Sequence, residues 1–559
     1  MIRSFAAIIV VLGIASCLCA DDVVRVDHSL IISGHPEATK AGITILRRGG
    51  NAIDALVTVS LSLGVTEPGN SGLGGKIALM YYDAKSKEIT FVAGMDQAAM
   101  KLPIDELVAR SADERKRGYD AVCVPGLAAG LEAAHKRWGT QAWNSLFDAP
   151  IKLARDGFEL SPLAAEMIAE FPKDIDAEAA RIYAPEGKHP APGSLLKNPD
   201  LAHTMQLMAD GGANAFYRGD VAQKIAAVMQ SNGGYLTAED LASFQPRFLK
   251  PLSGTFHEYT IFSSPPPLSG GTTLLAALGA LADADWKGGQ PRDARYIDTL
   301  CRVLQQIYPD VQRSAADAPD STERVARILD PENLKMIAKR AGAADPKKGA
   351  LSRLDRFDEF VMDDSPQAST THLIIIDRFG NIACATQSLG NHFGSAVVAP
   401  GTGVLLNNDM NNFAYATKGS INFVAPGKWP RSTMTPTIVL KSGKPFLVIG
   451  APGGQRIPVG VLQVTLDVLQ FNRPLKEVVD APRFHLRRNA SRNDPVNEID
   501  LDKDLDAALE EQLKNMGWAT FRKEKGEFYF GAVNAAMFLP NGKILGVADQ
   551  RRTGDAGGN

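Results

Sequence analysis

Short apolar runs separated by polar turns set the pattern around residue 370. A polar, hydroxyl-rich stretch ends at Thr370, and the apolar run 373–376 (Leu-Ile-Ile-Ile) begins three residues later. A turn-forming segment, 378–381 (Arg-Phe-Gly-Asn), separates this run from a second apolar run at 382–385. Short β-branched runs bounded by turn residues predict a buried β-hairpin. We therefore expect Thr370 where a loop enters a central strand.

Elsewhere the pattern mixes strands with helices. Strand-like or helical periodicity is found at 38–48, 77–82, 88–93, most of 126–245, and 272–281. Asn51 is placed to cap the helix that follows it, and the glycines at 49–50 are placed to end the helix before it. Thr237 and Asp240 have the spacing of a capping box. Residues 309–368 are polar, and we expect an exposed, mobile approach to the hairpin.

Composition and charge exclude several classes of function. The chain has 559 residues, of which 45% are hydrophobic, with a net charge of −3 and a pI near 6.3. Dispersed charges of both signs give no electrostatic case for nucleic acid or an anionic surface as a partner. Past the first twenty residues only Cys123, Cys301 and Cys384 remain, too few for a disulfide framework. Neither these cysteines nor the nine histidines have metal-ligand spacing, so we expect no metal site.

Residues 1–20 have the pattern of a secretion signal. Arg3 precedes an apolar run at 5–14, and small residues end the segment before two aspartates. The run is too short for a stable membrane span. We expect export to the periplasm or the cell exterior. The segment 14–17 (Ile-Ala-Ser-Cys) also resembles a lipoprotein cleavage box, and in this alternative a lipid on Cys17 would tether the mature chain to the membrane.

Thr370 has two interpretations from the residues alone. It can be a strand-entry hydroxyl that bonds to nearby backbone. Alternatively, a cut of the Ser369–Thr370 bond would place a free α-amine beside the threonine hydroxyl. An α-amine, with an unperturbed pKa near ~8, is a suitable base for this otherwise poor nucleophile. The same hydroxyl can make the cut by attacking the Ser369 carbonyl, before water releases the new terminus.

The stretch around Thr370 resembles the start of the small subunit in the gamma-glutamyltransferase (glutathione hydrolase) family. That subunit begins Thr-Thr-His or Thr-Ala-His, followed by an apolar strand and a turn with glycine, here 370–372 and Gly380. Further segments, together spanning about 26–553, resemble the family in the right order: 49–55, 153–158, 232–241, 263–271, 405–413, 428–437 and 450–457.

The resemblance implies the fold and the subunit organisation. The expected fold is of the α/β (α+β) class, a four-layer αββα sandwich of the N-terminal-nucleophile hydrolase type. One precursor would be cut into a large subunit, 21–369, and a small catalytic subunit, 370–559, which stay together as a heterodimer.

The resemblance also assigns catalytic roles. Thr370 would be the nucleophile, Ser388 would support its hydroxyl, and Gly453 and Gly454 would form the oxyanion hole. A Gly-Gly turn at a helix start offers unobstructed N–H groups to an oxyanion, although an ordinary strand–helix turn has the same pattern. No cofactor is needed for this chemistry.

Four further positions correspond to the part of the family site that holds the amino-acid end of the gamma-glutamyl donor. Ser432 and Thr433 match paired serines that hydrogen-bond the donor carboxylate. Asn412 matches an aspartate that binds the donor ammonium, so this chain lacks that charge. Asp409, a carboxylate one turn away, could compensate for it.

Other positions depart from the family. Met95 occurs where the family has an arginine that grips the donor carboxylate, and Gly390 where it often has Asn or Glu beside the amino group. Arg431 is a hypothetical replacement for the missing arginine, although a surface arginine is the ordinary interpretation. Lys76 and Ile77 stand where small residues are expected.

Together these residues predict an autoprocessed enzyme that transfers or hydrolyses an acyl group through an acyl-threonine. The substrate would be a small-molecule or peptide gamma-glutamyl amide, or a related amide lacking the free α-amino group. The alternative from another class is an unprocessed, non-catalytic binding protein of the same fold. A serine-type hydrolase is disfavoured because the chain has no nucleophile-elbow motif.

Overall fold

The computed structural model describes residues 22–170, 176–286, 289–348, 369–487, 497–524 and 529–559. The predicted secretion signal, 1–20, and the lipidation alternative at Cys17 lie outside these residues. Within the described ranges, no helix combines the length and the apolar character that a membrane crossing requires.

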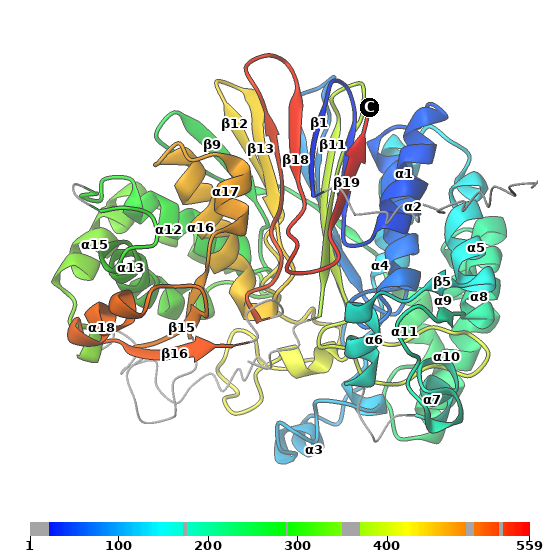
Figure 1. The fold of residues 1–559 in the computed structure, drawn as a ribbon. Helices are drawn as coiled ribbons and strands as arrows, with labels where there is room; N and C mark the ends of the chain where they lie inside the picture. Colours follow the sequence, from blue (N-terminus) through cyan, green and yellow to red (C-terminus); the bar gives the residue numbers. More distant parts are fainter. Residues whose placement is uncertain (1–21, 171–175, 287–288, 349–368, 488–496, 525–528) are drawn as a thin grey trace, which may run out of the picture.

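Two seven-stranded antiparallel sheets face each other at the centre of the molecule (Figure 1). The first sheet has the order β1 (Val23–Val26), β18 (Ile544–Val547), β17 (Asn534–Phe538), β13 (Lys444–Gly450), β12 (Thr437–Lys441), β9 (Tyr259–Ser263) and β8 (Leu252–Phe256). The second has the order β19 (Asp555–Gly558), β2 (Leu30–Ser33), β10 (Thr371–Ile376), β11 (Ile382–Ser388), β3 (Lys76–Tyr82), β4 (Ile89–Gly94) and β7 (Arg247–Leu249).

The predicted hairpin lies at the centre of the second sheet. Strands β10 and β11 pair in antiparallel register from Thr371 opposite Gln387 to Ile376 opposite Ile382. Gly380, at φ 84°, closes the turn, and Asp377 accepts hydrogen bonds from two backbone amides of that turn. Side chains alternate along β10, so that its odd-numbered residues face helices and its even-numbered residues face the other sheet. The sequence prediction is confirmed here.

Helices cover the outer face of each sheet, which gives four layers (Figure 1). Against the second sheet lie α1 (Pro36–Arg47), α2 (Ala52–Thr66) and α4 (Leu127–Trp138). Outside them lie α5 (Asp148–Asp156), α8 (Pro199–Gly211), α6 (Pro162–Ala169), α7 (Ala177–Tyr183), α9 (Asn214–Tyr217), α10 (Asp220–Ser231) and α11 (Ala238–Ser243). Against the first sheet lie α12 (Gly270–Leu281), α16 (Ile457–Leu469) and α17 (Leu475–Asp480), and α13 (Ala294–Gln312), α14 (Ser321–Ile328) and α15 (Pro331–Ala343) pack on α12.

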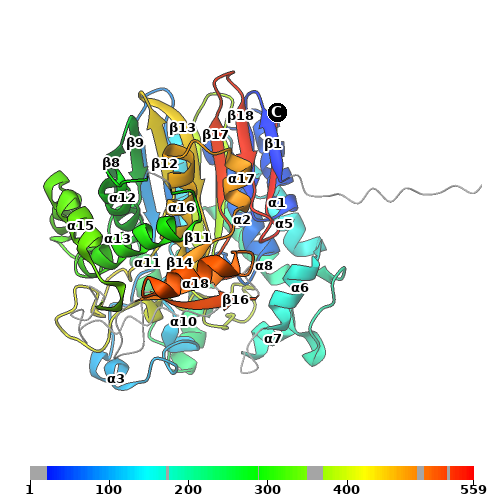
Figure 2. The same cartoon turned by 60° about the vertical axis from the view of Figure 1, so that its left-hand side comes forward.

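The remaining elements lie at one end of this sandwich. A small sheet of β14 (Phe484–Leu486), β15 (Glu498–Asp502) and β16 (Ala519–Lys523) lies with α18 (Ala507–Asn515) below α13 and α16 (Figure 2). Helix α3 (Ile104–Ala109) and the two-stranded sheet of β5 (Phe158–Glu159) and β6 (Leu195–Leu196) complete the chain. The four-layer αββα prediction is confirmed.

The predicted helix ends are confirmed as well. Asn51 caps α2 in a capping box with Asp54, and Thr237 does the same with Asp240 at α11. The prediction for 309–368 was wrong in its first part. Residues 309–312 belong to α13, and α14 and α15 follow, with apolar side chains buried against α12 and α13. The rest of that segment, 349–368, lies outside the described residues.

Residues from the two sheets meet where β10 begins. The ring of His372 lies directly over Gly450, the last residue of β13, where a Cβ atom would be 2.2 Å from the ring. Asn534 of β17 donates from Nδ2 to the His372 carbonyl at 2.8 Å. The chain leaving β13 toward Gly453 therefore starts at the same end of the sandwich as Thr370.

Candidate active site

Thr370 is the last residue before β10, and three segments of the chain contact it. Its side chain is buried, and Oγ1 donates to Ser388 Oγ at 2.9 Å. Its backbone N–H donates to the Asn70 carbonyl at 3.1 Å, and its carbonyl accepts from Arg552 Nη1 at 2.9 Å. The hydroxyl, the amide and the carbonyl of Thr370 are thus each fixed by a different segment of the chain.

The backbone at this junction is strained. Thr370 has φ 111°, a region that a β-branched residue rarely adopts and that costs about 1–3 kcal/mol. The preceding Ser369 is buried, and its Oγ lies 3.0 Å from the Gly69 carbonyl and 2.8 Å from the Asn70 carbonyl. The loop after α2 therefore holds both residues of the Ser369–Thr370 bond in place.

His372 supports the start of β10 and is unsuited to proton transfer. Its ring is fully buried, with Nδ1 2.8 Å from Thr386 Oγ1 and Nε2 3.6 Å from Cys384 Sγ. Burial lowers the pKa of His372 to about 3, so the imidazole stays neutral. It acts as a spacer between the sheets.

The Gly453–Gly454 turn joins β13 to α16 through the 3₁₀ turn Gly454–Arg456. Both glycines have positive φ, 134° and 58°, which explains why side chains are absent here. The Gly454 carbonyl accepts from Thr433 Oγ1 at 2.7 Å. Among the described residues we see no hydrogen bond donated by either glycine N–H. Both groups are therefore suited to an external acceptor.

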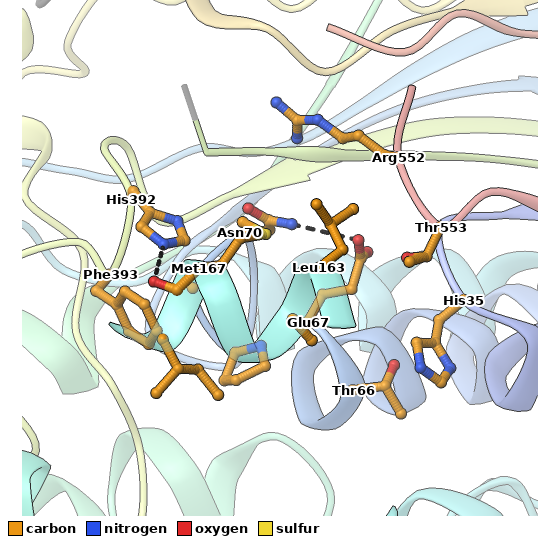
Figure 3. Close-up of a pocket in the computed structure, with 14 residues that line it drawn as sticks. His35, Thr66, Glu67, Asn70, Leu163, Met167, His392, Phe393, Arg552 and Thr553 are labelled. Atoms are coloured by element: carbon orange, nitrogen blue, oxygen red, sulfur yellow. Dashed lines mark hydrogen bonds between the residues drawn. The ribbon is translucent and has the colours of Figure 1, made fainter. Parts of the chain in front are cut away.

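A cavity of about 440 Å³, part of which is open to solvent, lies beside the loop that follows α2 (Figure 3). Glu67, Asn70, His392 and Arg552 contribute polar side chains, and α6 supplies apolar ones. Asn70 Nδ2 donates to Glu67 Oε1 at 3.2 Å, and burial raises the pKa of Glu67. Since Gly69 and Asn70 both line the cavity and contact Ser369, the cavity reaches the residues that hold the junction.

A buried charged cluster lies on the other side of Ser388. The ammonium of Lys76 contacts the Asp409 carboxylate directly and lies 3.6 Å from Asp96 Oδ2. All three side chains are at most 2% exposed. Burial lowers the pKa of Lys76 and raises the pKa of Asp96 to about 7. Lys76 is the cross-strand partner of Ser388, so the two side chains share one face of the sheet.

The residues predicted for the donor's ammonium lie around this cluster. Asn412 Nδ2 donates to Asp409 Oδ1 at 2.9 Å. Gly390, at φ 95°, donates from its N–H to Ser388 Oγ at 3.0 Å. A Cβ at Gly390 would come within 2.8 Å of Asp409 Oδ1. Asp409 therefore has its carboxylate engaged by Lys76 and Asn412, which leaves little capacity to replace a missing aspartate at 412.

The residues predicted for the donor's carboxylate are separated in space. The Met95 side chain is fully buried in the apolar layer between the two sheets. Arg431 is also buried, and its guanidinium donates to the backbone carbonyls of Gln312 and Ala315 at the end of α13. Its contacts are those of an architectural residue, and we leave it out of the proposed site.

Ser432 and Thr433 adjoin the Gly453–Gly454 turn. Both are buried, and Thr433 is tied to the Gly454 carbonyl. Ser432 Oγ accepts weakly from the Met434 N–H at 3.4 Å. Their hydroxyls remain the candidates for holding a polar end of the acyl group. Within the described part of the chain, no group of three His, Cys, Asp or Glu side chains has an arrangement that would hold a metal ion.

Sequence reasoning did not predict two contacts of this region. Arg552 donates to the Thr370 carbonyl. Lys76 was recognised as unusual at its position, but its pairing with Asp409 joins residues 333 positions apart. No local pattern reveals such a contact.

Two antiparallel sheets between helix layers, with a threonine at the head of a central strand, define the N-terminal-nucleophile hydrolase architecture. The solved structure of cephalosporin acylase from Bacillus halodurans has the same fold, with a TM-score of 0.84 at 23% identity, covering 97% of both chains. The family model for gamma-glutamyltranspeptidase matches residues 38–559. The chain belongs to the gamma-glutamyltranspeptidase family.

Two relatives show the breadth of this family. Glutathione hydrolase proenzyme from Bacillus subtilis (strain 168) is 32% identical over 543 residues, covering 94% of this chain and 91% of the relative. Acylase ACY 1 proenzyme from Pseudomonas sp. (strain SE83) is 29% identical over 556 residues, covering 97% and 95%. The chain is thus similar over nearly its full length to both a glutathione hydrolase and an acylase, as expected of an enzyme with gamma-glutamyltransferase- or hydrolase-like chemistry.

Proposed function

We propose that this protein is an autoprocessed amide acyltransferase or hydrolase whose nucleophile is Thr370. The observation that carries the proposal is the junction itself. A strained threonine follows a buried Ser369, and its hydroxyl is oriented by Ser388. Both relatives named above are proenzymes, which supports processing of this chain into two fragments.

Processing begins with attack of Thr370 Oγ1 on the Ser369 carbonyl carbon. The C–N bond breaks, the hydroxyl proton passes to the departing nitrogen, and the chain is then joined through an ester. Water hydrolyses the ester, which leaves a carboxylate on Ser369 and a free amine and hydroxyl on Thr370. Relief of the unfavourable φ at Thr370 favours this step, since its backbone is freed once the peptide bond is broken.

Turnover uses the same hydroxyl with the new α-amine as base. Thr370 Oγ1 attacks the amide carbonyl of the donor, and the amine takes the hydroxyl proton and passes it to the leaving amine. The N–H groups of Gly453 and Gly454 would hold the oxyanion, a contribution of typically about 3–4 kcal/mol per donor. Water or an acceptor amine then removes the acyl group from the threonine ester.

Donor recognition differs from that of a gamma-glutamyl transferase with an intact amino-acid pocket. The arginine position holds a buried methionine, and the aspartate position holds Asn412. We therefore propose a donor that is a gamma-glutamyl amide or a related acyl amide, with weakened reliance on the α-amino-acid end. The predicted secretion signal at 1–20 would export the chain, so that the enzyme would act in the periplasm or outside the cell.

The second candidate function is an unprocessed binding protein that keeps the fold. The observation in its favour is the loss of donor contacts at Met95, Gly390 and Asn412. The complete surroundings of Thr370 and the open geometry of the glycine turn favour the enzyme.

Mass spectrometry of the acylated small fragment tests the proposal. Purified protein is mixed with an acyl-p-nitroanilide, quenched in acid within seconds and analysed intact. We expect the acyl mass on the fragment 370–559, none with Thr370→Ala, and a slower but measurable signal with Thr370→Ser, which keeps the hydroxyl. Acylation of the Thr370→Ala variant would refute the assignment of the nucleophile.

A further inference from the structure

The Lys76–Asp96–Asp409 cluster places a buried lysine ammonium, covalently part of the chain, near the proposed nucleophile. Strand β3 begins at Lys76, directly after the segment 69–75, which contains four glycines, and its register sets Lys76 opposite Ser388. Ser388 in turn bonds the Thr370 hydroxyl at 2.9 Å. Since cross-strand partners lie about 5 Å apart at Cβ, the Lys76 side chain starts beside Ser388, the residue that contacts the Thr370 hydroxyl.

The ammonium of Lys76 is aimed at the acidic groups of the site. Lys76 contacts one oxygen of the Asp409 carboxylate, and Asn412 donates to the other. Asp96, two residues after the end of β4, also pairs with Lys76. Asp96 Oδ1 also accepts from the Gly126 N–H at 3.3 Å. Within the described residues, these carboxylates have Lys76 as their cationic partner.

A buried carboxylate needs a cation or it becomes protonated. A substrate ammonium could serve as that cation only if the position beside the carboxylates were empty in the free protein. Here the Lys76 ammonium fills that position. A second ammonium brought to the same carboxylates would meet Lys76 at close range in a nearly water-free environment, where like charges repel strongly.

We propose that Lys76 occupies the ammonium subsite of the donor pocket, so that the enzyme takes acyl amides whose acyl chain carries no α-ammonium group. This inference rests on the proposed function, because it concerns the donor of the same acyl transfer. It identifies the substrate class as amides of simple acyl or dicarboxylic monoacyl groups, and it makes Lys76 a specificity-determining residue.

Two chromogenic donors that differ by one group provide the test. Glutaryl-p-nitroanilide and γ-L-glutamyl-p-nitroanilide share the leaving group and chain length, and only the second carries an α-ammonium. The wild-type, self-cleaved protein is expected to favour the glutaryl donor in kcat/KM by on the order of 100-fold. A wild-type preference for the γ-glutamyl donor would overturn the inference without any variant.

Variants then test whether Lys76 sets the preference. Lys76→Gly with Asp96→Asn removes the cation and one carboxylate, and leaves Asp409 to receive a donor ammonium. We expect the kcat/KM ratio of the two donors to shift toward the γ-glutamyl one by at least about 30-fold. Asp96→Asn alone and Lys76→Arg both keep a cation at Asp409 and should retain the wild-type order.

The outcomes separate this inference from the proposed function. A chain that stays uncut and inactive on both donors would contradict the proposed function and this inference with it. An active, cleaved double variant with an unchanged donor ratio would overturn the role of Lys76 alone. If the double variant does not fold, two measurements on the wild type decide. The inference requires a higher kcat/KM for the glutaryl donor than for the γ-glutamyl donor, and it requires glutarate to inhibit more strongly than L-glutamate.

Discussion

Ser388→Ala removes the hydroxyl that contacts Thr370, the proposed nucleophile. Ser388 Oγ accepts from Thr370 Oγ1 at 2.9 Å and from the Gly390 N–H at 3.0 Å, and all of this is buried at the end of β11. The alanine variant keeps the strand register, since Ser388 pairs with Lys76 through its backbone. The substitution removes the two hydrogen bonds that the hydroxyl accepts and the weaker one that it donates to the Gly390 carbonyl at 3.4 Å.

The magnitude follows from those two bonds. A buried donor left without its acceptor costs about 1–3 kcal/mol, and the Thr370 hydroxyl becomes free to rotate away from the carbonyl it must attack. At about 1.4 kcal/mol for each factor of ten, we expect a loss of roughly 10- to 100-fold in the rate of self-cleavage and in kcat/KM. The fold itself should be destabilised by about 1 kcal/mol, because the structural contacts that are lost are those to the Gly390 N–H and carbonyl.

The assay combines a denaturing gel, sampled over time after refolding, with turnover of a chromogenic acyl-p-nitroanilide. Ser395→Ala is a matched control: Ser395 is buried, donates to the Leu406 carbonyl at 2.9 Å and accepts from the Val397 N–H at 3.3 Å. Ser388→Thr should recover much of the lost rate. If Ser388→Ala cleaves and turns over like the wild type, Thr370 is not oriented by this contact and the reasoning fails.

Two other perturbations have definite signs. Burial raises the pKa of Asp96 to about 7 from its ordinary 3.8, so the folded state holds this proton more tightly and stability falls as pH rises between these values. The urea midpoint should therefore fall more between pH 5 and pH 8 for the wild type than for Asp96→Asn. Equal falls in the two proteins would argue against a buried, proton-binding Asp96. Arg552→Met removes the donor to the Thr370 carbonyl and should slow self-cleavage by roughly 10- to 100-fold, as expected for a charged hydrogen bond worth about 1.5–3 kcal/mol. Arg552→Lys should recover part of the rate, and a methionine variant that cleaves at the wild-type rate would show that Arg552 is not a positioning residue.

Local patterns predicted individual elements, whereas the four-layer arrangement was expected from the family resemblance. The hairpin around residue 370, the capped start of α2 at Asn51 and the glycine turn before α16 all depend on neighbouring residues, and all were predicted. The error at 309–343 has a physical cause. Helices α14 and α15 bury only one narrow stripe each, so their composition is mostly polar and resembles that of an exposed loop.

The site was harder to predict because its contacts join distant segments. Thr370 was a candidate nucleophile through the resemblance of its surrounding residues to the family, and this role stays a prediction. Its partner Arg552 lies near the end of the chain, and the approach of these two residues depends on β19 pairing beside β2. Arg431 illustrates the converse. Its position next to Ser432 suggested a substrate contact, but tertiary packing directs its guanidinium to the end of α13.

The measurement that tests the central claim most directly is N-terminal sequencing of the smaller band from a denaturing gel of the purified protein. The account predicts two bands, the smaller of which begins Thr-Thr-His at Thr370. The Thr370→Ala variant should give one uncut band. A wild-type chain that remains a single band after prolonged incubation, or a cut at another bond, would contradict the proposed nucleophile and favour the unprocessed binding protein.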